Sequence, residues 1–189
     1  NVKSVETELI KIEEASGRIC AKDIFATYPL PRFDNSAMDG YAVNFEDANC
    51  EVKVISKSFA GDEISTFSLQ KGECVKVMTG ASIPQNTTAI VPQEDIEILD
   101  DHTIKLPKII SKMQFVRFVG EDIDIGEQVI KKYQEIHFGV VAMLASQGIT
   151  DIEVYKKPKI AIFASGEEIR PHYEKIEAHQ IFNSNSPSL

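Results

Sequence analysis

The stretch from Tyr41 to about Arg117 constrains the fold more than any other part of the chain. It consists of short runs rich in valine and isoleucine, several of them separated by glycine–acid or Asp-Asp turns. Runs of this kind form half-buried strands, and their close spacing is typical of a small barrel or sandwich. The runs are CEVKVIS (50–56), ECVKVM (73–78), TAIVPQ (88–93), IEIL (96–99) and TIKLP (103–107).

The pattern changes on both sides of this β-rich stretch. Residues 5–25 begin with an alternating piece and then become helix-like, with four apolar residues on one helical face. These are Ile12, Ala15, Ile19 and Cys20. FGVVAMLASQ (138–147) indicates a buried helix with Gly148 at its C-terminal cap, and ITDIEVY (149–155) a strand.

We therefore expect an α+β multidomain fold. Residues 1–25 and 127–157 would form a discontinuous, elongated linking domain. Residues 26–126 would form a β-rich, barrel-like domain inserted into it. The boundaries follow from the change from helical to β texture near Phe25 and back near Gly126.

The last part of the chain has a third texture. KIAIFASGEEI (159–169) indicates a buried strand, a Ser-Gly turn and the start of a helix, which together open an α/β unit with a parallel sheet. One strand and one helix do not complete a doubly wound domain. We expect residues 158–189 to be the truncated start of an α/β domain and the chain to be a fragment.

The composition excludes several classes of protein. The 189 residues carry a formal charge of −9, which argues against binding to nucleic acid or to a membrane surface. No apolar run approaches the roughly 20 residues that span a bilayer, and the polar N-terminal stretch does not resemble a signal peptide. The three cysteines are widely spaced, which indicates reduced structural thiols in a cytoplasmic protein.

Two acids stand five residues apart in PRFDNSAMDGYAV (31–43). Asp34, Asn35 or Ser36 could cap a short helical turn, and Asp39 with the following glycine could form a tight turn before a strand at Tyr41. Alternatively, the two carboxylates could hold a cation or position a substrate, with small neighbours that let a ligand approach the backbone.

Three further stretches allow a structural or a functional interpretation. The turn at Thr79-Gly80-Ala81-Ser82 is an ordinary small-residue turn or an oxyanion site made of a hydroxyl and backbone N–H groups. FVGEDIDIGEQ (118–128) is a solvated acidic turn or a source of oxygen ligands for Mg²⁺. Ser165 and Gly166 follow the expected buried strand, where ligands bind in α/β sheets, with Glu167 and Glu168 in the first helical turn.

Taken together, these motifs resemble those of one family in the same order. The matching words are SGRICAKDI (16–24), PLPRFDNSAMDGYAV (29–43), MTGASIP (78–84), GEDI (120–123), and KIAIFASGEEI (159–169) with NSN (183–185). The sequence is similar, over nearly its whole length, to the MoeA-type molybdopterin molybdenumtransferases, whose relatives include the C-terminal domain of gephyrin.

The resemblance implies an enzyme of molybdenum cofactor biosynthesis. Such enzymes insert molybdate into adenylylated molybdopterin, with Mg²⁺ assisting, and release AMP. They have an elongated domain I, an inserted β-rich domain II, an α/β domain III and a C-terminal barrel. They are homodimers in which domain III of one subunit and domain II of the other form the active site. An upstream adenylyltransferase of the MogA type is an expected partner.

The resemblance also implies a set of site residues. The catalytic candidates are Asp39, Thr79, Asp122 and Glu168, and the three acids among them are the candidate Mg²⁺ ligands. The cofactor-binding candidates are Ser36, Gly80, Ser165 and Gly166. The sequence departs from the family where Arg117-Phe118-Val119 replaces a basic run, and where ASGEEI replaces an STGDEL-like word.

Two functions of different classes follow. The first is the N-terminal part of a molybdenum insertase, inactive as a fragment. The second is a gephyrin-like scaffolding or binding module without catalysis. The acidic chain, which carries no long linker, favours the enzyme.

Overall fold

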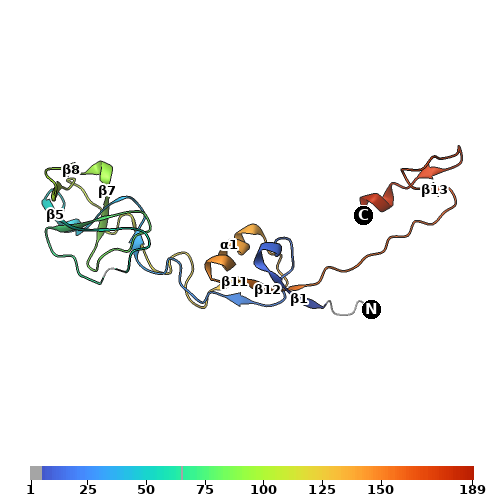
Figure 1. Ribbon diagram of the computed structural model, residues 1–189, viewed down its shortest axis with the longest axis horizontal. Coiled ribbons are helices and arrows are strands. Elements are labelled where there is room, and N and C mark those ends of the chain that lie inside the picture. Colours follow the sequence, from blue (N-terminus) through green and yellow to red (C-terminus); the bar gives the residue numbers. More distant parts are fainter. Residues whose placement is uncertain (1–5, 65) are drawn as a thin grey trace. The chain divides into compact units, whose positions relative to one another are not determined.

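The computed structural model describes residues 6–64 and 66–189 (Figure 1). It divides into two compact units. One is Leu9–Val154, and the described part of the other comprises residues 6–8 and 155–189. None of the helices described is long and apolar enough to cross a membrane.

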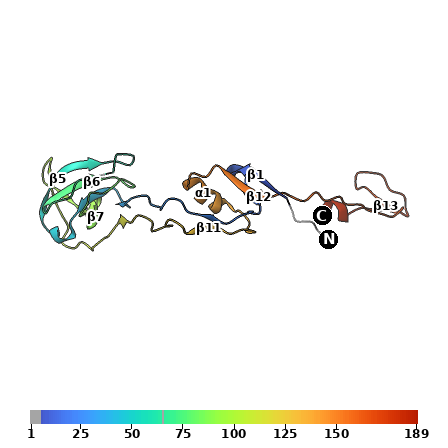
Figure 2. The same cartoon turned by 90° about the horizontal axis from the view of Figure 1, so that it is seen from below.

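A six-stranded mixed sheet dominates the larger unit (Figure 2). In spatial order its strands are β7 (Ala89–Pro92), β4 (Gly40–Val43), β6 (Glu73–Val77), β5 (Glu51–Ser58), β9 (Thr103–Lys105) and β8 (Glu97–Ile98). Only β5 and β6 run parallel. The sheet is a half-barrel, since β7 and β8 are its two edges and do not pair with each other. The β-rich texture of this stretch is therefore confirmed.

Strands β4, β6 and β7 are buried on both faces of the sheet, which explains why these strands are mainly apolar, whereas β5 and β8 are largely exposed. Tyr41 and Cys74 belong to the cluster on one face. Ala42 and Val75, their neighbours along the strands, belong to the cluster on the other. Burial raises the pKa of the Cys74 thiol to about 12, so this cysteine packs as an unreactive apolar residue.

A second core in the same unit joins residues from near its N-terminal end with residues from near its C-terminal end. Ile12 and Cys20 pack in one cluster with Ile136, Leu144 and Val154. The elements around it are β1 (Thr7–Lys11), paired with β12 (Asp151–Tyr155), β2 (Ile24–Phe25), paired with β11 (Gln128–Ile130), the 3₁₀ turn η1 (Ile12–Glu14) and the helix α1 (Phe138–Ser146). Two further 3₁₀ turns are η2 (Phe45–Asp47) and η3 (Gln93–Asp95). The division into a linking domain and an inserted domain at residues 26–126 stays a prediction.

The helix expected near Ile12 is wrong beyond a single 3₁₀ turn. The backbone N–H groups of Gly17 and Cys20 donate to Ile136 and Gln134, not to carbonyls one turn back. Gly17 has φ of +75°, which breaks a helix at that point. Pairing with a distant segment therefore replaces the helix that the apolar spacing indicates.

Helix α1 is present where it was expected, but it is not a buried helix. Leu144 is its only fully buried residue, and Phe138 at its start is 85% exposed. The expected cap is confirmed: Gly148 has φ of +71° and donates its N–H to the carbonyl of Ala145.

The smaller unit contradicts the expected strand and helix. Ile160 and Phe163 are 79% and 89% exposed, and residues 156–165 form no strand. Glu167 and Glu168 lie in a turn, not in a helix. The regular elements here are β13 (Ile169–Arg170), parallel to β14 (Ile181–Phe182), and α2 (Asn185–Ser188). A buried parallel strand needs neighbours and covering helices, and the described part of this unit supplies neither.

Gly40 allows a close approach that the sheet requires, because a Cβ atom there would lie 2.2 Å from the carbonyl oxygen of Val91. We expect Gly40→Ala to lower the free energy of unfolding by about 3 kcal/mol or more. Gly139→Ala in α1 is the control, since its Cβ would meet only the movable ring of His137 and should stabilise by at most about 1 kcal/mol. Denaturant unfolding measures both, and equal stability of Gly40→Ala and the parent chain would contradict the close approach.

Candidate active site

The three motifs of the larger unit lie side by side. The short strand β3 (Asn35–Ser36) pairs on one side with β10 (Val116–Arg117). On its other side, the N–H of Ser36 donates to Ala81, and the N–H of Gly80 donates to Ser36. Segments 34–40, 78–84 and 115–122 therefore form one hydrogen-bonded layer, although up to 88 positions separate them in the sequence.

Ser36 shapes the loop that carries Asp39. Its side chain is buried, and its hydroxyl donates to the carbonyl of Met38 at 2.6 Å. The same hydroxyl oxygen accepts from the Met38 N–H at 3.3 Å. This local turn replaces the helical turn that the sequence also allowed, so the hydroxyl of this cofactor-binding candidate is engaged with the loop itself.

Asp39 and Thr79 form the closest contact among the predicted catalytic residues. Asp39 Oδ1 accepts from the backbone N–H and from the hydroxyl of Thr79, each at 2.7 Å. Both side chains are exposed. The backbone N–H, then the hydroxyl, and more weakly the charge of Lys76 hold the pKa of Asp39 below its ordinary value. The carboxylate is therefore ionised at neutral pH and fixed in orientation.

Asp34 does not pair with Asp39. Its Oδ1 atom accepts from the backbone N–H of Val119 at 2.8 Å, and its carbonyl accepts from the N–H of Ile83. Asp34 thus ties its own loop to the two neighbouring loops of the layer. The two acids of the opening motif thus have separate hydrogen-bond partners, and the interpretation that they act as a pair stays a prediction.

Asp122 is bound to a cation of the protein. Arg117 donates through Nη2 to Asp122 Oδ1 at 2.6 Å and through Nε to Glu121. Glu121 and then Asp122 raise the pKa of Arg117. The Phe118 N–H and Arg117 hold the pKa of Glu121 below its ordinary value. The one arginine of this loop is thus neutralised by its own neighbours.

Glu168, Ser165 and Gly166 belong to the smaller unit. The Glu168 carboxylate folds back over Gly166, where a Cβ atom would lie 2.6 Å from Glu168 Oε2. Gly166 has φ of +136°, which favours glycine at this position.

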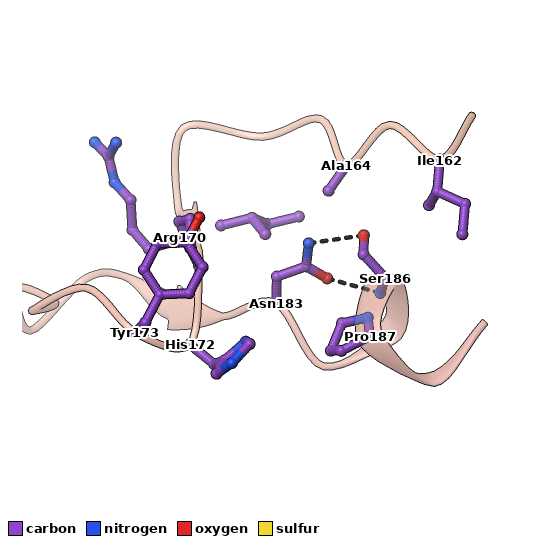
Figure 3. A pocket seen from close by; sticks show the side chains of 10 residues that line it. Ile162, Ala164, Arg170, His172, Tyr173, Asn183, Ser186 and Pro187 are labelled. Carbon is purple, nitrogen blue, oxygen red and sulfur yellow. Dashed lines mark hydrogen bonds between the residues drawn. The ribbon is translucent and has the colours of Figure 1, made fainter.

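A cavity of about 480 Å³ lies beside this turn in the smaller unit (Figure 3). Arg170, Tyr173 and Asn183 line it, and Asn183 exchanges hydrogen bonds of 2.8 and 3.0 Å with Ser186. None of Ser165, Gly166 and Glu168 is among its lining residues.

The two candidate Mg²⁺ ligands of the larger unit, Asp39 and Asp122, already have partners within the protein. In the part of the chain that the structure describes, no three His, Cys, Asp or Glu residues are grouped to hold a metal ion. Asp39 is held by Thr79, and Asp122 is held by Arg117. A guanidinium on a carboxylate competes directly with a metal cation. The Mg²⁺ site expected from the resemblance stays a prediction.

Comparison with known proteins decides the family. The family model of the MoeA N-terminal region, domains I and II, matches residues 1–148. The chain belongs to the MoeA family. The match includes Asp39, Thr79 and Asp122 but ends before Glu168.

Curated relatives agree with this family along the whole chain. A protein of Haemophilus influenzae named molybdopterin molybdenumtransferase is 35% identical over 95% of this chain and 45% of its own length. A protein of the same name from Staphylococcus aureus is 36% identical over 95% of this chain and 44% of its own. The chain thus spans a little under half the length of these relatives.

Solved structures agree as well. The MoeA protein of Pyrococcus horikoshii OT3, a molybdopterin biosynthesis protein, is 32% identical, with a TM-score of 0.84. The likeness covers 97% of this chain and 50% of that one. The fold of this MoeA family member is therefore that of the corresponding half of a solved relative.

The structure gives three residues of this MoeA chain contacts or positions that the sequence did not indicate. The acid Asp34 stands out in the sequence, but its hydrogen bond to Val119 spans 85 positions and leaves no local pattern. Asn183 belongs to the NSN word, and the structure shows that it lines the cavity of the smaller unit. Arg170 follows Glu167 and Glu168 closely in the sequence, and such a charge pattern is also common on ordinary protein surfaces.

The hydrogen bonds from Thr79 predict how Asp39 titrates. We expect Thr79→Ala to raise the pKa of Asp39 toward its ordinary value but not fully, since the backbone donor remains. Thr79→Ser keeps the hydroxyl and should keep the low pKa. NMR titration of the Asp39 carboxyl carbon measures all three proteins.

The same titration predicts a small effect of pH on stability. A carboxyl whose pKa is lower in the folded state contributes stability above its unfolded pKa of about 4, and this contribution is lost as the pH falls through the folded value. The acid-induced loss attributable to Asp39 should therefore be smaller in Thr79→Ala. An identical Asp39 pKa in Thr79→Ala and the parent chain would contradict the role of the hydroxyl.

Proposed function

We propose that this chain is the N-terminal part of a molybdopterin molybdenumtransferase, which inserts molybdate into adenylylated molybdopterin with release of AMP. The observation that carries the proposal is the Asp39–Thr79 pair. Its residues come from the two most specific family words and share hydrogen bonds of 2.7 Å. The names of the curated relatives support the same reaction.

Within this proposal, Asp39 orients the substrate. The carboxylate is ionised and accepts two hydrogen bonds from Thr79, so it is a fixed acceptor just before the start of β4. An ionised acceptor in a fixed position binds N–H or O–H donors of a substrate without reorganising. Thr79 holds that acceptor in position. Gly40, which directly follows Asp39, allows the backbone to lie close to the carbonyl of Val91.

The remaining parts of the expected activity are proposals on the same basis. Glu168 and the cavity lined by Asn183 would bind the pterin in the smaller unit. Mg²⁺, homodimer formation, a MogA-type adenylyltransferase partner and a cytoplasmic location rest on the family resemblance. No catalytic step here is assigned to Mg²⁺, since among the described residues no three acids, histidines or cysteines are grouped to hold a metal ion.

We expect the 189-residue chain alone not to convert adenylylated molybdopterin. It spans less than half of the relatives that carry the activity's name. Incubation of the purified chain with adenylylated molybdopterin and molybdate, followed by detection of AMP, tests this. Stoichiometric or greater AMP release would contradict it and would place the complete active site within these residues.

In the full-length protein that contains these residues, Asp39→Asn should lower molybdenum insertion about 100-fold or more. The amide keeps the size of the side chain and can still accept from Thr79, so the fold should survive. Asp62→Asn is the matched control, since Asp62 only accepts from the N–H of Phe59 in a local turn.

Insertion rate and thermal unfolding should be measured on the same three proteins. Loss of activity with unchanged unfolding supports the proposed role of Asp39. Equal insertion by Asp39→Asn and the parent protein would return Asp39 to a turn-forming role. Absence of any insertion by the full-length parent protein would favour the scaffolding alternative.

A further inference from the structure

Two lysines stand directly beside each other on neighbouring strands of the half-barrel. In the parallel pair of β5 and β6, Lys57 is in register with Lys76. In the antiparallel pair of β4 and β6, Lys76 is in register with Tyr41. The three residues therefore form one row across the sheet, and Lys76 Nζ lies 6.0 Å from the centroid of the Tyr41 ring.

An irregularity in β5 creates this row. Val54 is in register with Cys74, but Ser56 is in register with Val75, so one extra residue is inserted between them. Without that insertion the register would place Ser56 beside Lys76. Since successive residues of a strand alternate between faces, Lys57 would then lie on the opposite face from Lys76. A bulge of this kind re-aims side chains and is common next to functional sites. Here it brings a second cation to the first.

A cavity of about 250 Å³ lies over the row. Lys57 and Lys76 line it together with Tyr41, Val54 and Ile104, which belong to the core of that face or pack against it. Ile98, Asp100 and Asp101 complete the lining. The cavity thus combines apolar side chains with two adjacent cationic groups and two acids.

Neither lysine has an ion-pair partner among the residues that the structure describes. Like charges directly opposite on neighbouring strands repel each other, and this pair occurs in a chain with a net charge of −9. Asp100 and Asp101 line the same cavity, but neither carboxylate forms an ion pair with either lysine among the described residues. The N–H of His102 donates to Asp100 at 2.8 Å and holds the pKa of that carboxyl below its ordinary value, so Asp100 stays charged. An anion between the lysines would relieve their repulsion.

The row is close to the candidate catalytic pair. Asp39 stands two residues before Tyr41, and Gly40 between them is in register with Val77, the neighbour of Lys76. The charge of Lys76 acts on Asp39 strongly enough to contribute to its low pKa. A group bound between the lysines would therefore lie next to the Asp39–Thr79 pair.

We propose that Lys57 and Lys76 form a subsite for a tetrahedral oxyanion of the substrate, beside the Asp39–Thr79 pair. Two such groups exist in the reaction: the phosphate of the adenylyl group, which leaves as AMP, and molybdate. The subsite rests on the proposed function for the identity of its ligand. The cavity, the register and the paired charges belong to this chain alone.

Binding to the 189-residue chain tests the subsite without any catalysis. Lysine side-chain and backbone NMR signals are followed while AMP, inorganic phosphate, molybdate or adenosine is added. We expect AMP, molybdate or both to shift the signals of Lys57, Lys76 and Tyr41, and adenosine to leave them unchanged. A response to AMP and phosphate identifies the phosphate of the substrate as the source, and a response to molybdate alone identifies molybdate.

Variants then test the two lysines. Lys57→Gln and Lys76→Gln should each weaken the binding about tenfold, since each removes one charge-assisted contact. Lys53→Gln is the matched control, because Lys53 is exposed on the same strand but lies before the bulge and outside the cavity. It should bind as the parent chain does.

Three results would overturn the subsite. The first is no shift of the Lys57 and Lys76 signals with any of the anions at about 10 mM, roughly a hundredfold above the protein concentration. The second is equal anion binding by Lys57→Gln, Lys76→Gln and Lys53→Gln. The third is that adenosine shifts these signals as much as the anions do. Because this experiment reads binding and not AMP release, a failed subsite leaves the proposed insertion activity standing, and a failed insertion assay leaves the subsite standing.

Discussion

The backbone hydrogen bonds of Asn35 and Ser36 are the interaction on which the candidate site depends. This two-residue strand pairs with Val116 and Arg117 on one side and bonds to Gly80 and Ala81 on the other. The pairing of β4 with β6, in which Gly40 is in register with Val77, brings the loops of Asp39 and Thr79 together, and the strand at Asn35 and Ser36 ties both loops to the third. Loops that carry functional side chains need such a scaffold, and here three loops provide it for one another at the ends of the strands.

The β-rich part of the fold could be predicted because its signal is local. Runs such as ECVKVM are short, apolar and bounded by turns, and both faces of the resulting strands are buried. The helix expected after Ile12 failed because long-range pairing used the donors of Gly17 and Cys20. The strand expected at KIAIF failed for a related reason, since its burial depends on neighbours that lie elsewhere in a sheet.

The sequence named candidate site residues but could not indicate which side chains would contact each other. The family words identified Asp39 and Thr79, and the structure shows them in contact. Spacing alone suggested a pair of Asp34 and Asp39, which the turn at Ser36 separates into different environments. The register of Lys57 with Lys76 depends on an inserted residue in β5, and no sequence pattern marks where a strand will bulge.

Electrostatics links these local features to the proposed chemistry. An acidic chain repels anionic substrates at long range, and that repulsion is screened over about 8–10 Å at physiological ionic strength. Recognition then depends on the few charges within that distance. Arg117 does not serve, since Glu121 and Asp122 already neutralise it. Lys57 and Lys76 line a cavity together with apolar side chains, and neither lysine has an ion-pair partner in the part of the chain that the structure describes. A net charge of −9 is thus compatible with an anionic substrate, because the local arrangement of cations, not the total charge, determines what the site attracts.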